Sequence, residues 1–215
     1  MSIAIRQSPI IFEPKAAEKT NSLGWEVVLK LEGEGDGPWL VDLSHLQRWD
    51  CQDMELDSMA PFGLNMPAKP GQVVFQDDKI IARMNPTQAM ITCLRTGDPI
   101  EIPTAVRFTD ITDAHCMLAV VGPEIARVME HVSNLDLFTP GRKMPFLTQG
   151  PIMHIPCQVV TLSGECVLMS FSRGYGQSFA DAMLRAASGC GLRPGGEGVF
   201  NHMPDLSPES GFSPG

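Results

Sequence analysis

Short runs of alternating or continuous apolar residues, separated by glycine, proline and acidic turns, fill most of this chain. Runs of this length and pattern are typical of β-strands. They predict strands within residues 24–33, 37–45, 73–94, 104–112, 115–122, 152–162 and 165–171. Asn85-Pro86 interrupts one of these runs and Ser163-Gly164 separates two others, so both dipeptides predict hairpin turns. The chain is therefore expected to consist mainly of strands.

Two segments have the spacing of helices instead. Residues 123–132 begin with a proline, which is favoured in the first helical turn, and carry apolar side chains at i, i+3, i+4 and i+7. This stripe, which is expected to be buried, consists of Ile125, Val128, Met129 and Val132. Residues 178–188 carry a second stripe, made of Phe179, Ala182, Met183 and Ala186. A weaker helix in residues 53–64 is expected to end early, at a proline and a glycine.

The sequence SRGYGQS, residues 172–178, leads into the second of these helices. A glycine-rich helix start exposes backbone N–H groups and can bind an anion. A dinucleotide fingerprint, however, needs a third glycine where this chain has Phe179. We therefore expect the loop to begin a helix, with Gln177 or Ser178 near its cap. Asp181 in the first turn would pair with Arg185.

The same order of elements occurs twice, about 70 residues apart. Residues 36–93 and 104–171 each predict a strand, a short helix, a Pro-Gly pair and a hairpin. Asp42 and the two residues after it match the triplet that begins at Asp110. These two pseudo-repeated strand–helix–hairpin units predict an α+β fold in which both halves pack over one core.

The expected organisation places one domain between two terminal segments. Residues 1–22 are polar and contain proline, so they are expected to form an N-terminal arm. Residues 23–194 form the domain of two pseudo-repeats. Residues 195–215 are rich in glycine, proline and serine and are expected to form a flexible tail.

Charge and composition exclude several classes of partner. The 215 residues carry a net charge of −9, which argues against nucleic acid or an anionic membrane surface as the partner. No apolar run approaches the ~20 residues of a membrane span. The N-terminus lacks the apolar core of a signal peptide, so a cytoplasmic protein is expected. The six cysteines form no CxxC pair and are expected to be thiols, and the histidine spacing predicts no metal site.

Several motifs resemble those of a known family, in the family's order. They are VDLSH (41–45), LAVVGPEIARVM (118–129), KMPFL (143–147), IPCQVVTLSGE (155–165) and GLRPGGEG (191–198). They resemble the aminomethyltransferases, the family of the T-protein of the glycine cleavage system. The chain is more similar still to the gamma subunit of heterotetrameric sarcosine oxidase, at NLDL (134–137), SFA (178–180) and RMNPTQAMI (83–91). The resemblance covers roughly residues 25–198.

The resemblance implies the folate-binding fold of that family, without its C-terminal domain, and it implies candidate site residues. The family's catalytic aspartate follows a Gly-Gly pair, and here only Asp77 and Asp78 resemble it. The Tyr-Thr-Gly-Glu loop that contacts folate is reduced to Leu-Ser-Gly before Glu165. On the resemblance alone, Asp77 or Asp78 would be catalytic and Glu165 would bind the pterin ring.

Each candidate also has a purely structural interpretation. Asp77 and Asp78 fit a solvated hairpin turn, and Glu165 fits a hairpin tip. Ser44 and His45 are neighbours in a strand, so their side chains point to opposite faces and cannot act on each other. Asp42 and Ser44 share a face and are expected to hydrogen-bond the next strand.

Three functions remain in view. The first is an accessory, gamma-type subunit of an amine-oxidising or N-demethylating complex, linked to one-carbon capture by tetrahydrofolate. Its partner would be a larger flavin-containing oxidoreductase subunit, with flavin and nicotinamide on partner chains only. The second is a minimal tetrahydrofolate-dependent aminomethyl or methyl transferase. The third is a stand-alone folate-binding or scaffold protein. In the first case, Ile10, Ile11 and Phe12 of the arm are expected to become ordered mainly in the complex.

Overall fold

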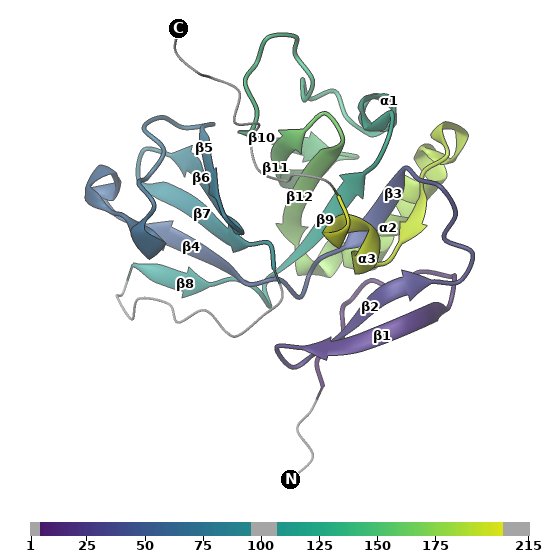
Figure 1. Cartoon of the computed structure of the whole chain (residues 1–215). Coiled ribbons are helices and arrows are strands. Elements are labelled where there is room, and N and C mark those ends of the chain that lie inside the picture. The colour runs from purple at the N-terminus through teal and green to yellow at the C-terminus, as the bar shows by residue number, and fades with distance from the viewer. Residues whose placement is uncertain (1–4, 96–106, 204–215) are drawn as a thin grey trace, which may run out of the picture.

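The computed structural model describes residues 5–95 and 107–203, and these residues form two stacked β-sheets with helices on one side (Figure 1). In these ranges the larger sheet has six strands in the order β10-β11-β12-β9-β3-β13, all antiparallel except β13 on β3. The strands are β3 (Trp39–Asp42), β9 (His115–Val121), β10 (Phe146–Ile152), β11 (Ile155–Ser163), β12 (Cys166–Ser172) and β13 (Arg193–Gly195).

The smaller sheet contains, within the same described ranges, five antiparallel strands in the order β5-β6-β7-β4-β8. Its strands are β4 (Arg48–Gln52), β5 (Val73–Gln76), β6 (Lys79–Asn85), β7 (Gln88–Cys93) and β8 (Phe108–Asp110). A separate hairpin pairs β1 (Ala16–Ser22) with β2 (Trp25–Leu31). The prediction of a chain built mainly from strands is therefore confirmed.

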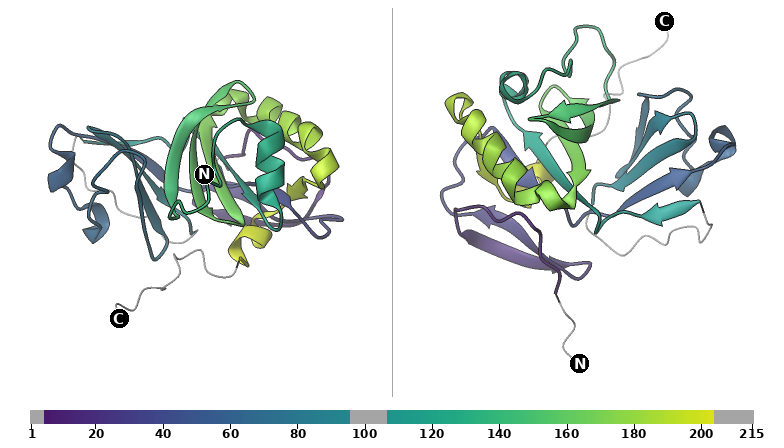
Figure 2. Two further views of the ribbon diagram at one scale, coloured as in Figure 1. Left: turned by 90° about the horizontal axis from the view of Figure 1, so that it is seen from above. Right: turned by 180° about the vertical axis from the view of Figure 1, so that it is seen from behind.

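The layers follow from which face of each strand is apolar. Helices α1 (Ile125–Val132) and α2 (Gly176–Ala186) cover the outer face of the larger sheet, as Figure 2 shows. A second apolar core fills the space between the two sheets. A third, smaller core lies outside the smaller sheet, under two short 3-10 helices, η1 (Leu56–Ser58) and η2 (Pro61–Gly63). These short helices replace the weak helix predicted for residues 53–64.

The two sheets exchange one strand each. The smaller sheet takes β8 from the second half of the chain, and the larger sheet takes β3 from the first half. Apart from β13, each sheet therefore consists of four strands of one half followed by one strand of the other. This order agrees with the predicted repeat, although superposition of residues 36–93 on 104–171 remains a prediction.

Two matching corners carry the chain between the sheets. After β3, Asp42 Oδ1 accepts a hydrogen bond from the Ser44 backbone N–H at 3.0 Å. After β8, Asp110 Oδ1 accepts one from the Thr112 N–H at 2.8 Å. Arg48 joins the corners, because its Nη2 donates to the carbonyls of Ser44, Thr112 and His115 at 2.9–3.0 Å. Burial lowers the pKa of Arg48 to about 10, against the opposing effect of nearby acidic groups.

The two α-helices agree with the sequence to different degrees. The stripe of α1 is confirmed, since its four predicted residues are all buried. In α2, Phe179 and Met183 are buried as predicted, but Ala186 is exposed and Ala182 only half-buried. Ala180 and Ala187 are buried instead, so the buried face of α2 is rotated about the helix axis from the predicted one.

Both terminal segments hold more structure than predicted. Residues 5–15 lie on the body as an arm, but residues 16–22 form the strand β1. The expected flexible tail, residues 195–215, starts at the last residue of β13 and continues into α3 (Glu197–Asn201), in which Glu197 and Phe200 are each 1% exposed. Phe200 packs into the core between the sheets, and this burial holds the segment in place. Residues 204–215 lie outside the described ranges.

Candidate functional site

Asp77 and Asp78 form the two-residue turn between β5 and β6. Asp77 is exposed and has a left-handed backbone with φ of 57°. Asp78 Oδ1 accepts a hydrogen bond from Lys79 Nζ at 2.6 Å, and the Cys93 thiol approaches its Oδ2 at 3.6 Å. Partial burial acts to raise the pKa of Asp78, but the hydrogen bond and charge of Lys79, together with the hydrogen bonds from its own backbone and the Cys93 thiol, outweigh it, so this pKa lies below its ordinary value. The turn that the sequence suggested is present, and Asp78 is already paired within it.

Glu165 lies far along the fold, at the tip of the β11–β12 hairpin in the larger sheet. Its side chain is exposed and borders a groove of about 790 Å³. The groove is also lined by Trp39, Gly122 and residues of α3 and the segment that follows it. Neither Asp77 nor Asp78 borders this groove. The structure therefore does not bring the three candidate carboxylates of the sequence into one site.

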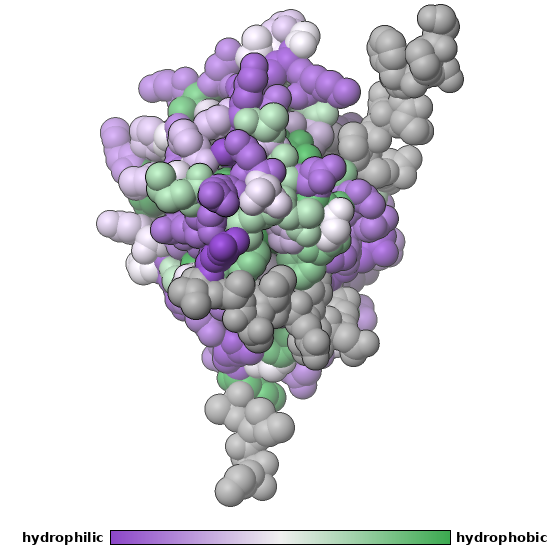
Figure 3. Space-filling model, turned by 90° about the vertical axis from the view of Figure 1, so that its left-hand side faces the viewer, coloured by the Kyte–Doolittle hydropathy of each residue, from purple (hydrophilic) through white to green (hydrophobic). Residues whose placement is uncertain are grey.

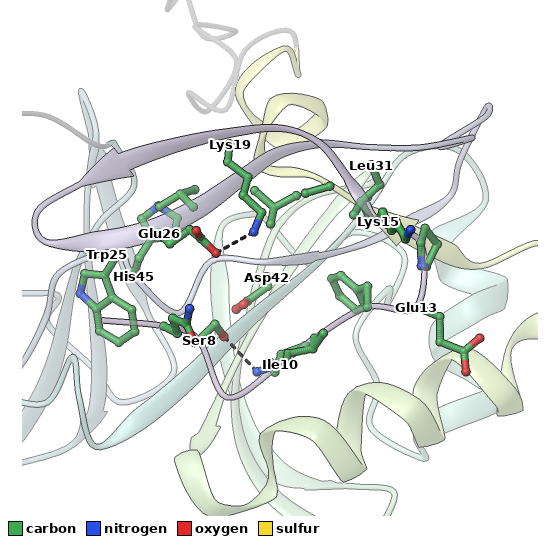
Figure 4. Close-up of a pocket in the computed structure, with 18 residues that line it drawn as sticks. Ser8, Ile10, Glu13, Lys15, Lys19, Trp25, Glu26, Leu31, Asp42 and His45 are labelled. Carbon is green, nitrogen blue, oxygen red and sulfur yellow. Dashed lines mark hydrogen bonds and ion pairs between the residues drawn. The ribbon is translucent and has the colours of Figure 1, made fainter. Parts of the chain in front are cut away.

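A second cavity, of about 570 Å³, lies between the β1–β2 hairpin, the N-terminal arm and the corner after β3 (Figure 4). We call it the arm cavity. Its lining is mixed. Ile10, Trp25, Val27 and Leu31 are almost completely buried and form the apolar part. The charged part includes Glu13, Lys15, Lys19 and Glu26.

Asp42 and His45 are the polar groups that the corner contributes to the arm cavity. His45 is 5% exposed, and its Nε2 lies 3.3 Å from Oε1 of Glu197, which is 1% exposed. Ser44 turns the other way, and its Oγ accepts a hydrogen bond from the Met117 N–H at 3.2 Å. The side chains of Ser44 and His45 therefore do not act on each other, as predicted, but both residues lie in the turn after β3 and not in the predicted strand. Ser44 bonds the next strand as expected, whereas Asp42 bonds Ser44 instead.

The hairpin carries charged and aromatic groups above the cavity. Lys19 Nζ lies 2.8 Å from Glu26 Oε1, so these two charges neutralise each other. The guanidinium carbons of Arg6 and Arg173 lie 5.1 and 5.3 Å from the centre of the Trp25 ring, within cation–π range. These contacts fix the indole as a wall of the cavity.

The SRGYGQS loop fastens the arm that closes this cavity. Gln177 accepts a hydrogen bond from the Ile11 N–H at 2.7 Å and donates to the Ile11 carbonyl at 3.1 Å. Arg173 Nη2 donates to the Gln7 carbonyl at 3.0 Å. The loop does begin a helix, as predicted, but at Gly176. Asp181 accepts from Gln177 at 2.9 Å in place of the expected partner Arg185.

Sequence reasoning missed Glu197, because it assigned this residue to a flexible tail. In residues 5–95 and 107–203, no three His, Cys, Asp or Glu side chains are grouped closely enough to bind a metal ion. None of the helices in these ranges has the length and hydropathy needed to cross a membrane.

The chain was compared with known protein families, sequences and structures. No family model matches the chain. One segment is 30% identical over 98 residues to the sarcosine oxidase subunit alpha of Rhizobium meliloti (strain 1021), which is 42% of this chain and 10% of that subunit. The chain thus spans only about a tenth of the length of that relative.

Two solved structures share the architecture. A chain of the heterotetrameric sarcosine oxidase from Corynebacterium sp. U-96, solved in complex with pyrrole 2-carboxylate, matches with a TM-score of 0.58 at 13% identity, over 70% of this chain and 83% of that one. The glycine cleavage system aminomethyltransferase T from Bartonella henselae matches with a TM-score of 0.53 at 16% identity, over 84% of this chain and 56% of that one. The resemblance drawn from the motifs is therefore confirmed at the level of the fold, which is mixed α/β with mostly strands.

Proposed function

We propose that this chain is an accessory, gamma-type subunit of an amine-oxidising or N-demethylating complex, and that it docks on a larger flavin-bearing chain in the cytoplasm. Two likenesses support this assignment. The fold covers most of a chain of a heterotetrameric sarcosine oxidase, and one segment is similar in sequence to a sarcosine oxidase alpha subunit. Flavin, nicotinamide and the tetrahydrofolate that captures the one-carbon unit would then be bound mainly by the partner chains.

The dispersal of Asp77, Asp78 and Glu165 is the observation that carries this proposal. A transferase must hold its acid–base group and its ligand-binding groups around one reacting centre. Here the two aspartates occupy a turn of the smaller sheet, and Glu165 occupies a hairpin tip of the larger sheet. Asp78 is moreover paired with Lys79. A docking role requires no such gathering of carboxylates.

The surface of the molecule is compatible with docking. Hydrophobic residues gather near the middle of the face in Figure 3, on the side of the smaller sheet, with polar residues around them. Next to η1, the side chain of Met54 is 86% exposed. Flexible, polarizable methionine side chains are common at protein–protein contacts. This face is a reasonable first target for variants that weaken docking.

Co-expression tests the subunit assignment directly. The tagged chain, produced with the flavin-bearing subunits encoded beside it in its native host, is expected to co-purify with them in a fixed ratio. Analytical ultracentrifugation should show one larger species that carries the flavin absorbance. A lone chain that stays apart from those subunits and turns over an N-methyl donor with tetrahydrofolate would overturn the proposal.

One observation favours the second candidate, a minimal tetrahydrofolate-dependent transferase. The groove beside Glu165 has about 790 Å³ and an aromatic wall at Trp39, which would suit a pterin ring. Calorimetric titration of the lone chain with tetrahydrofolate tests it. Binding that is lost in Glu165→Gln but kept in Glu130→Gln, an exposed carboxylate on α1, would support a folate site. Binding without turnover would instead indicate a stand-alone folate-binding protein.

A further inference from the structure

The middle of the N-terminal arm, residues 7–14, is attached to the body at both of its ends. We call this segment the strap. Before its start, Arg6 pairs with Trp25 in a parallel β-bridge. After its end, the Lys15 carbonyl accepts a hydrogen bond from the Glu32 N–H at 2.9 Å. The strap is therefore a short segment without regular secondary structure that lies between two fixed ends.

Between these ends, the hydrogen bonds that join the strap to the body come from two side chains of one loop, in the part of the chain that the structure describes. Gln177 bonds both the N–H and the carbonyl of Ile11, at 2.7 and 3.1 Å, and Arg173 donates to the Gln7 carbonyl at 3.0 Å. All of these bonds are exposed to solvent, where water competes for the same groups. A segment held by exposed bonds opens locally at a lower free energy than the core.

One side chain of the strap points inward. Ile10 is 6% exposed and packs in the core under α1 and α2, whereas the next residue, Ile11, is 75% exposed. The strap meets the body at Gly176, where an added Cβ would lie 3.0 Å from Pro9 Cγ, 3.3 Å from Ile10 Cγ1 and 3.0 Å from Cys116 Sγ. Pro9 and Ile10 therefore lie next to the Cys116 thiol, which is 0% exposed.

The strap also forms one side of the arm cavity. Most of its residues line the cavity, and Figure 4 shows it opposite the β1–β2 hairpin. On the hairpin, Trp25, Val27 and Leu31 are each at most 3% exposed with the strap in place. Movement of the strap away from the body would open the cavity to solvent and expose these apolar side chains.

We propose that the strap opens and closes over the arm cavity while both of its ends stay attached, with Gln177 as the latch. Opening breaks the exposed bonds to Gln177 and Arg173 and withdraws Ile10 from the core. The cavity and the Cys116 thiol then become accessible to solvent. This inference goes beyond the proposed docking function, because the strap, the latch and the cavity all belong to one chain.

Thiol labelling of the full chain tests the proposal. The parent variant Cys190→Ser lacks the partly exposed thiol. Incorporation of N-ethylmaleimide at each remaining cysteine in native buffer is followed by peptide mass spectrometry. Cys116 should be labelled at least about tenfold faster than Cys166, because Cys166 lies in the core between the sheets and is reached only by global unfolding.

Removal of the latch should favour the open strap. In the parent background, Gln177→Ala should raise the labelling rate of Cys116 about tenfold and leave the rate of Cys166 unchanged. Gln149→Ala is the matched control. Gln149 also makes an exposed hydrogen bond to a backbone carbonyl, that of Met84, but it does not contact the strap.

Removal of the inward side chain should have the same effect. Ile10→Ala should raise the ratio of the Cys116 rate to the Cys166 rate about tenfold, because less apolar surface holds the strap closed. Ile11→Ala is the control on the neighbouring residue, since it shortens an exposed side chain and keeps the same backbone bonds. It should leave the ratio unchanged.

Equal labelling of Cys116 and Cys166 in the parent chain would overturn the proposal, because the strap would then open only when the whole domain unfolds. It would also be overturned if Gln177→Ala and Ile10→Ala left the ratio of the two rates unchanged, or if the controls raised it as much. Failure of co-purification with flavin-bearing subunits would leave all of these rates unaffected.

Discussion

At the scale of single residues, the cysteines divide sharply by burial. Cys51, Cys93, Cys116, Cys157 and Cys166 are buried, while Cys190 is partly exposed beside His131 Nδ1 at 3.4 Å. A thiol reacts as its thiolate and needs access to the reagent. In the native protein we therefore expect one cysteine, Cys190, to react quickly with a thiol reagent such as Ellman's, and all six to react in urea. The variant Cys190→Ser should lack the fast phase, and a fast phase of two or more thiols would contradict the fold.

Because these thiols are buried, the free energy of unfolding is expected to fall at alkaline pH. Burial raises the pKa of Cys51 and Cys157 to about 11 and that of Cys166 to about 12, from the ordinary thiol value of 9.0. Because the folded state holds these protons more tightly, the stabilisation is complete below about pH 9 and is lost as the pH rises through 11–12. Urea unfolding at successive pH values should show this decline. Cys166→Ala should reduce its slope, whereas Cys190→Ser serves as the control.

Residue chemistry was predictable from the sequence only in part. The separation of the Ser44 and His45 side chains was predicted from the alternation of side chains along a strand, whereas both residues lie in the turn after β3. The pair of His45 with Glu197 joins positions 152 residues apart, and no local pattern encodes such a contact. The same limit applies to Asp42, which borders the arm cavity only because the hairpin and the arm lie around it.

At the scale of elements, α3 is the clearest case of structure in a segment of unpromising composition. Phe200 is 1% exposed and packs in the core between the sheets. Phe200→Ala should therefore lower the free energy of unfolding by about 3–5 kcal/mol. The neighbouring exposed Asn201, changed to alanine, should have an effect within about 0.5 kcal/mol. Equal midpoints for both variants in urea would show that α3 does not contribute to the core.

Elements in which large apolar residues recur with a clear helical period were predictable, and elements without such a period were not. The prediction of the buried stripe of α1 was correct, because four large apolar residues fix the orientation of this helix. In α2, alanines make up half of the stripe, and their small side chains leave the helix rotation to tertiary packing. The glycine-rich run before α3 suggested a tail, but Gly196 lies against the backbone of Leu29, where an added Cβ would meet the carbonyl oxygen at 2.4 Å. Those glycines permit close packing rather than mobility.

At the scale of the whole molecule, the exchange of β3 and β8 ties the two halves together. Neither sheet is complete without a strand from the other half, and Arg48 links both corners. We therefore expect a single cooperative unfolding transition. Trp39 lies in the larger sheet and Trp49 in the smaller one, so their fluorescence reports on the packing of both sheets, while far-ultraviolet circular dichroism reports on the backbone of the whole chain. The two probes should give the same midpoint in urea, and separate midpoints would contradict a single cooperative transition.

The strand exchange also bears on how the chain is made. When the first half leaves the ribosome, β3 lacks its partner β9, and β4 lacks β8 on one side, because both partners belong to residues synthesised later. The pairing of Trp39 with Arg193 must wait for nearly the entire chain. During synthesis the nascent polypeptide therefore carries open strand edges, which are prone to pair with other chains. We therefore expect both sheets to be completed only after the second half of the chain has been synthesised.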